Sequence, residues 1–118
     1  MSANKRTKWG RRRQAEFWVF LLLTDNNGSH MPRWRVMWAL KRIESRFPGG
    51  GTVHSRGKGW WPNRNGRQCR DVILPVQVVV PAHAREGAMQ WFDDFRAEAA
   101  RELGQEEIFI LYRPAYVL

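Results

Sequence analysis

Apolar residues and turn-forming residues alternate along the chain in a way that predicts four strands. The continuous apolar run at residues 17–23 has strand length and no polar alternation, as expected of a central strand covered on at least one face. A second strand begins at residues 52–55. Asn65-Gly66 is a strong hairpin signal ahead of a long run rich in Val and Ile at residues 69–80. The run at residues 108–112 predicts the last strand.

Two segments follow the helical period instead. Residues 31–47 place apolar side chains at every third or fourth position, which forms one core-facing stripe of Val36, Leu40, Ile43 and Phe47. Residues 86–103 repeat the pattern, with one face made of Ala88, Phe92, Phe95 and Ala99. Ser29 or Asn27 is the expected N-cap of the first helix, and Gly104 stands where the second helix needs a C-cap.

The order strand, helix, strand, strand, helix, strand is that of the ferredoxin-like fold. We therefore expect one α+β domain at residues 15–118, with two helices on one face of a four-stranded antiparallel sheet. The other face of such a sheet is normally covered by a partner, a ligand or a second copy. Pro75 lies inside the long strand, and proline cannot donate a ladder hydrogen bond, so we expect that strand to bulge or to lie at an edge.

Charge adds a functional expectation, because it is concentrated in the first part of the chain. The 118 residues carry a net charge of +9, and residues 1–70 hold 16 Lys or Arg against three acids. Residues 1–14 show no hydrophobic periodicity and are predicted to be a flexible basic arm. Such an asymmetry predicts a positive surface directed at DNA or RNA, and the alternative is a complement to an acidic protein.

The segment at residues 55–70 interleaves cations, tryptophans and glycines. Cations neutralise phosphates and indole rings stack on bases, so this segment is the predicted centre of a nucleic-acid interface. The alternative is that Trp60 or Trp61 folds back into the core. With the arm and an arginine stripe on the first helix, the candidate binding residues are Arg11, Arg12, Arg13, Arg35, Arg42, Arg46, Arg56, Lys58, Trp60, Trp61, Arg64, Arg67 and Arg70.

Several short motifs resemble those of a small uncharacterised bacterial family of ferredoxin-like domains, often exported, in which no activity is established. The matching residues are Arg46-Phe47-Pro48, Thr52-Val53, Gly59-Trp60, Gly66, Asp71 and Gln105-Glu106. The resemblance covers about two thirds of the chain and implies the same fold.

Catalysis has less support in the sequence. The single cysteine, Cys69, excludes an internal disulfide and a multi-cysteine zinc site, and the three histidines lack the spacing of metal ligands. A metal-assisted phosphodiesterase is the enzymatic alternative. In it, Asp25 follows the first strand, as in the small ferredoxin-like nucleases of CRISPR adaptation that the chain resembles in topology and size. Asp71 and the Glu106-Glu107 pair would be further Mg²⁺ ligands.

The sequence thus predicts a non-catalytic nucleic-acid-binding module without cofactor or metal. We expect it in the cytoplasm, because the apolar stretch at residues 17–23 is short for a signal peptide and is followed by Asp25-Asn26-Asn27-Gly28 where small cleavage-site residues would be needed. We do not expect it in a membrane, because no apolar run approaches the roughly 18–20 residues of a membrane span. Two alternatives remain. One is a protein–protein subunit that dimerises through its open sheet face with tryptophan anchors. The other is a small-molecule-binding domain whose pocket contains Asp71, His54 and Tyr112.

Overall fold

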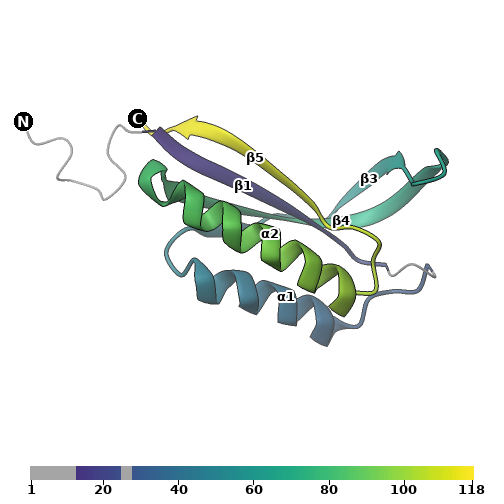
Figure 1. The fold of residues 1–118 in the computed structure, drawn as a ribbon. Coiled ribbons are helices and arrows are strands. Elements are labelled where there is room, and N and C mark those ends of the chain that lie inside the picture. Colours follow the sequence, from purple (N-terminus) through teal and green to yellow (C-terminus); the bar gives the residue numbers. More distant parts are fainter. Residues whose placement is uncertain (1–12, 25–27) are drawn as a thin grey trace, which may run out of the picture.

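The computed structural model describes residues 13–24 and 28–118 and shows an α+β fold. Five strands form one antiparallel sheet, and two long helices cover one of its faces (Figure 1). A single 3₁₀ turn links the fourth strand to the second helix. In chain order the elements are β1 (Arg13–Leu22), α1 (Arg33–Arg46), β2 (Gly51–Val53), β3 (Gly57–Pro62), β4 (Gln68–Pro81), η2 (Ala82–Ala84), α2 (Arg85–Glu102) and β5 (Phe109–Tyr116).

The long strand β4 organises the sheet. The strand order is β2-β4-β1-β5, and β3 also pairs with β4. β1 pairs with β4 from Gln14–Pro81 to Leu22–Ile73, and with β5 on its other side. The sheet therefore has five strands where four were expected, because the edge strand beside β4 is divided into β2 and β3.

The expectation for Pro75 is wrong, and the register shows why. β4 is a central strand, and its pairing with β1 runs past Pro75 without a bulge. The extra residue lies in the neighbouring edge instead, where three residues between Val53 and Gly57 face two residues of β4. The Pro75 carbonyl accepts from His54 on that side, so the nitrogen without a hydrogen also faces the break between β2 and β3. No ladder bond to β1 is lost.

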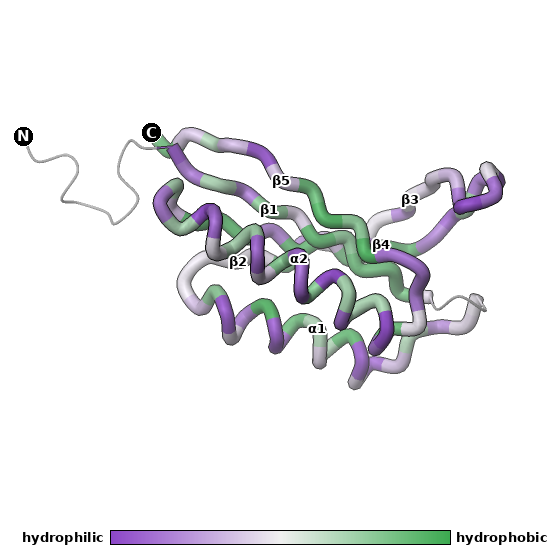
Figure 2. The backbone as a smooth tube through the Cα atoms, viewed as in Figure 1, coloured by the Kyte–Doolittle hydropathy of each residue, from purple (hydrophilic) through white to green (hydrophobic). Residues whose placement is uncertain are grey.

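The core lies between the sheet and the helices. Alternate residues of β1 point toward the helices, and Phe17, Val19 and Leu21 are almost completely buried there. The ring of Phe17 stacks on Phe92 of α2 at 4.8 Å between centroids. Figure 2 shows the resulting pattern, with hydrophobic strands through the middle of the molecule and a hydrophilic tip on the β3–β4 hairpin.

The helices match their predicted faces but not all their predicted caps. All four apolar residues expected on the inner face of α2 are buried, as are Ile43 and Phe47 near the end of α1. Gly104 adopts a φ of 61°, and its N–H bonds to the carbonyl of Arg101, which confirms the expected C-cap. The N-cap of α1 is Pro32 with no side-chain hydrogen bond, so Ser29 does not serve as the cap. Asn27 lies outside the described residues.

The sheet begins before residue 15, which was the expected start of the domain. β1 begins at Arg13, so Arg13 and Gln14 belong to the sheet and not to the segment before it. Residues 1–12, which include Arg11 and Arg12, lie outside the described residues. Among the helices that the structure describes, none combines the length and hydropathy needed to cross a membrane.

Candidate nucleic-acid interface

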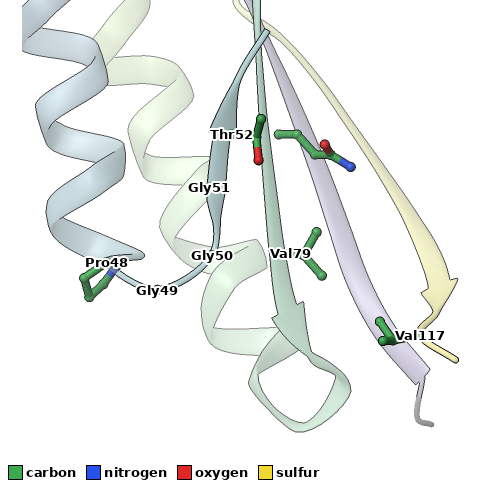
Figure 3. Close-up of a pocket in the computed structure, with 8 residues that line it drawn as sticks. Pro48, Gly49, Gly50, Gly51, Thr52, Val79 and Val117 are labelled. Atoms are coloured by element: carbon green, nitrogen blue, oxygen red, sulfur yellow. The ribbon is translucent and has the colours of Figure 1, made fainter. Parts of the chain in front are cut away.

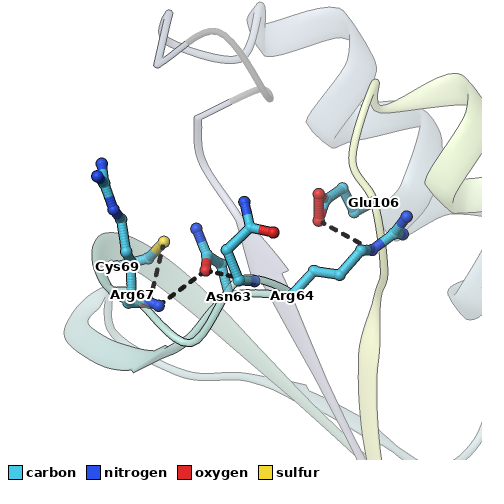
Figure 4. A network of polar contacts seen from close by, with 6 residues as sticks. Asn63, Arg64, Arg67, Cys69 and Glu106 are labelled. Atoms are coloured by element: carbon cyan, nitrogen blue, oxygen red, sulfur yellow. Dashed lines mark hydrogen bonds and ion pairs between the residues drawn. The ribbon is translucent and has the colours of Figure 1, made fainter.

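The β3–β4 hairpin extends past the end of the two-layered part of the molecule (Figure 1). Its turn is closed by Asn63, whose backbone N–H donates to the Arg67 carbonyl at 2.7 Å. The Asn63 side-chain oxygen accepts from the backbone N–H groups of Asn65 and Arg67 at 2.9 and 3.0 Å, as Figure 4 shows. Gly66 completes the turn with a φ of 79°, a conformation that favours glycine.

One face of this hairpin combines positive charge with an accessible indole ring. Trp60 is paired directly with Arg70 across the two strands, and Lys58 lies two residues further along β3. Because directly paired residues and residues two apart point to the same side, these three side chains share one face. Trp60 is 67% exposed there. We call Lys58, Trp60 and Arg70 the cationic hairpin face.

The opposite face of the hairpin has a different character. A Cβ placed on Gly59 would lie 2.9 Å from the ring of Trp61, so that ring packs directly over the glycine and beside Ile73. Asp71 is on the same side and accepts a hydrogen bond from the Thr24 hydroxyl. The carboxylate nearest to Arg70 in sequence therefore points away from the cationic hairpin face. Trp60 is the indole with a free ring, while Trp61 is partly buried.

Further cations lie around the hairpin. Arg64 is within 3.9 Å of Glu106, but both side chains are more than half exposed, so this ion pair is weak. Among the described residues, no carboxylate forms an ion pair with Arg56, Lys58, Arg67 or Arg70. Four positive charges on one projecting element are therefore available to a ligand.

The arginines of α1 do not join this surface. α1 lies in the helix layer and the hairpin extends beyond the sheet, so the predicted cations form two separate groups (Figure 1). Arg42 pairs with Glu98 of α2 at 2.6 Å and lies over the Trp91 ring. The guanidinium of Arg46 lies 4.8 Å from the Phe47 ring centroid, and that of Arg35 lies 5.3 Å from the Trp34 ring centroid. Contacts within the protein therefore occupy the guanidinium groups of Arg35, Arg42 and Arg46.

The carboxylates considered for metal catalysis line one depression of about 650 Å³. Asp71, Glu106 and Glu107 all border it, between the hairpin and the loop before β5. Within the described residues, however, no three His, Cys, Asp or Glu side chains come close enough together to hold a metal ion. Asp25, the other catalytic candidate, lies outside the described residues.

The small-molecule pocket expected around Asp71, His54 and Tyr112 is not formed. Asp71 lies at the hairpin, and Tyr112 packs on the helix side of the sheet against Phe17 at 5.2 Å. His54 follows β2 and contacts Trp18 instead. The three side chains therefore occupy different regions.

A second depression lies beside the glycine-rich segment before β2, with a volume of about 550 Å³ (Figure 3). It is bordered by residues 48–52, Gln77, Val79 and Val117. None of these side chains is charged, so the depression offers no ion-pairing group to a phosphate.

The pairing of Trp60 with Arg70 was missed from the sequence. A two-residue Asn65-Gly66 turn would pair Arg64 with Arg67 and, counting outward, Trp61 with Arg70. The actual turn comprises residues 63–67 and pairs Pro62 with Gln68, which shifts the register by one. Asn63 is the sequence signal for this longer turn, because asparagine side chains form hydrogen bonds with the backbone of turns.

Comparison with solved structures shows where this fold recurs. The chain is similar in fold to a Bacillus cereus protein related to NIF3, with a TM-score of 0.51 and 14% sequence identity. The alignment covers 89% of this chain and 26% of that one, so this chain spans about a quarter of the other's length. No family model and no curated protein matches the chain. At this identity the likeness shows the fold alone.

Proposed function

We propose that this chain is a nucleic-acid-binding module and that the β3–β4 hairpin is its contact element. The observation that carries the proposal is the cationic hairpin face, where the exposed Trp60 is paired with Arg70 and lies two residues from Lys58 on the same side of β3. Phosphates supply the negative charge that such cations bind, and a nucleic-acid base supplies the flat π-surface that an indole binds.

The fold provides a support for this contact. We interpret the sheet as a ferredoxin-like arrangement whose second strand is divided into β2 and β3, because β5, β1 and β4 and the divided edge follow one another across the sheet. The break between β2 and β3 lies where the sheet ends and the hairpin begins to project. The hairpin is thus anchored through β4 and still exposes the cationic hairpin face to solvent.

Arg56, Arg64 and Arg67 extend the positive charge along the hairpin. They suit the phosphates on either side of a base stacked on Trp60. Contacts of this kind carry little sequence information, so we propose binding without strong base preference. A cytoplasmic location, where nucleic acid is accessible, belongs to the same proposal, and no catalytic step is part of it.

Fluorescence anisotropy with labelled single-stranded and double-stranded oligonucleotides tests this function. We expect binding at low salt that weakens as salt is added, and a marked loss in a Lys58→Ala/Arg70→Ala double variant. The matched control is Arg96→Ala/Arg101→Ala, which removes two cations from the exposed side of α2. Equal losses in the two double variants would show that net charge alone binds the oligonucleotide, and absence of binding at low salt would disprove the proposal.

A further inference from the structure

The sheet face that the helices leave uncovered, which we call the open face, is apolar across several strands. Paired residues point to the same side, so the registers identify its members. Trp18 of β1 lies between Gln77 and Leu111, and Phe20 lies between Pro75 and Phe109. The apolar residues of the open face in β1, β4 and β5 are Trp18, Phe20, Leu22, Ile73, Pro75, Val79, Phe109 and Leu111.

Aromatic rings form a continuous row on the open face. The ring of Phe109 meets Phe20 at 5.7 Å between centroids, and Phe20 is stacked with Trp18 at 6.2 Å. Trp18 in turn contacts His54 at 4.8 Å. Phe109 is 60% exposed and Leu111 is 43% exposed. A row of mutually packed rings with this exposure is a preformed surface for another apolar surface.

The polar groups on the open face already have partners within the chain. The Glu16 carboxylate accepts from Arg113 at 2.5 Å and from Gln77 at 2.6 Å. The Gln77 side-chain oxygen is 3.0 Å from the His54 ring nitrogen. Across β1, β5 and the part of β4 from Ile73 to Val79, the open face holds one carboxylate and one guanidinium, Glu16 and Arg113, which pair with each other. This part of the face is therefore neutral, and a surface that covers it leaves no charge buried without a partner.

We propose that a second copy of this chain covers the open face, so that the protein is a homodimer. Charge distinguishes this occupant from the others. A polyanion or an acidic protein would be drawn to cations, and the open face has no net positive charge although the whole chain carries +9. A neutral and apolar face can pack against the same face of a second copy, which is what a two-fold interface requires.

The size of the open face fits the same conclusion. β1 has 10 residues, so at about 3.3 Å per residue the face is about 33 Å long. Four strands at about 4.8 Å spacing make it about 19 Å wide, which gives a projected area of about 600 Å². Accessible area exceeds projected area because side chains roughen the surface. Stable interfaces bury about 600–1,000 Å² per partner, so one open face reaches this range.

Sedimentation equilibrium over a range of protein concentrations tests the dimer. We expect the mass to approach twice the 13.9 kDa of one chain. Phe109→Glu and Leu111→Glu each place an unpaired charge in the proposed interface, and each should weaken dimerisation at least tenfold. Both side chains are exposed in the single chain, so circular dichroism should show an intact fold.

Trp34→Glu is the matched control, because Trp34 is 65% exposed on α1 and lies in the helix layer. It should leave the dimer intact. A one-chain mass at every concentration would overturn the proposal, as would a dimer that both open-face variants leave unchanged. If the wild-type chain has a one-chain mass and Phe109→Glu nevertheless loses single-stranded oligonucleotide binding, the open face binds nucleic acid instead. The hairpin variants test a different surface, so the two proposals fail independently.

Discussion

Glu16 lies in the middle of an apolar strand and is only 6% exposed. Burial is the largest single influence on this carboxyl group and opposes its ionisation. Hydrogen bonds from Arg113, Trp18 and Gln77 together outweigh burial, so the pKa of Glu16 is lowered from its usual value. The ionised group is therefore part of the folded structure and links β1 to both of its neighbouring strands.

The lowered pKa of Glu16 has a consequence for acid stability. The unfolded chain binds a proton at Glu16 more readily than the folded chain does, so this contribution is present above the unfolded pKa and is lost as pH falls through the folded pKa. We expect Glu16→Gln to lower the free energy of unfolding by about 1–2 kcal/mol near neutral pH, because charged hydrogen bonds are lost. We expect little effect once Glu16 of the wild type is protonated.

Urea unfolding at a series of pH values from neutral downward measures this difference, because the contribution of Glu16 is lost as pH falls through its folded pKa. Glu102→Gln, at the exposed end of α2, is the control. A Glu16→Gln variant with the same deficit at every pH would contradict the role of the charge.

Trp60 is the second residue with a specific expected role. If a base stacks on its free ring, Trp60→Ala should cost about 1–3 kcal/mol of binding to a single-stranded oligonucleotide, which is a loss of affinity of about 5-fold to 160-fold. Trp34→Ala, which removes an equally exposed indole from α1, should leave the affinity unchanged. Titration by fluorescence anisotropy compares the two, and equal effects would remove Trp60 from the interface.

At the scale of elements, the β3–β4 hairpin depends on its own turn, because beyond the sheet its two strands have few other supports. A two-stranded hairpin is marginal in isolation. The Asn63 side chain contributes two hydrogen bonds to the backbone of the turn, at Asn65 and Arg67. The position of the cationic hairpin face therefore depends on a residue that carries no charge.

Asn63→Ala should loosen the hairpin while leaving the rest of the domain folded. We expect faster amide hydrogen exchange in residues 57–72, by about 1 kcal/mol of local opening free energy, and weaker oligonucleotide binding. Asn65→Ala is the matched control, because Asn65 takes part through its backbone N–H and not through its side chain. If hairpin exchange rates are the same in both variants, the side chain of Asn63 does not set the turn.

At the scale of the whole molecule, the two candidate surfaces are separate. The hairpin carries positive charge and an exposed indole, and the open face is neutral and apolar. The two proposals therefore assign nucleic-acid binding to the hairpin and dimerisation to the open face. Two copies joined through their open faces would present two hairpins, which raises the effective concentration of each for a long strand.

Salt dependence tests how much of the binding is electrostatic. If Arg56, Lys58, Arg67 and Arg70 each neutralise one phosphate, the logarithm of the binding constant for a single strand should fall with the logarithm of salt concentration at a slope of about −3. Arg70→Ala should reduce that slope by about 0.7. A slope near zero, or one that Arg70→Ala leaves unchanged, would contradict phosphate contacts at this residue.

Much of the fold was predictable from the sequence, because periodicity reports burial directly. The inner stripe of α2, the apolar run of β1 and the hairpin before the long strand all have local signals that the structure retains. For the candidate site, the sequence predicted which residue types are present but not how they are arranged in space. Arg42 looked like a free cation, but α2 brings Glu98 within 2.6 Å of it, and that contact joins residues 56 positions apart.

The sequence by itself determined the two helices, the strand-rich α+β class and the concentration of cations and tryptophans at residues 55–70. These follow from spacing along the chain, which sets the side that each residue faces within its own element. Only the tertiary structure decided the break between β2 and β3, the register that pairs Trp60 with Arg70, and the burial of Glu16 among its partners. These depend on which strands meet and in which register, and a shift of one residue moves every side chain of a strand to the other face.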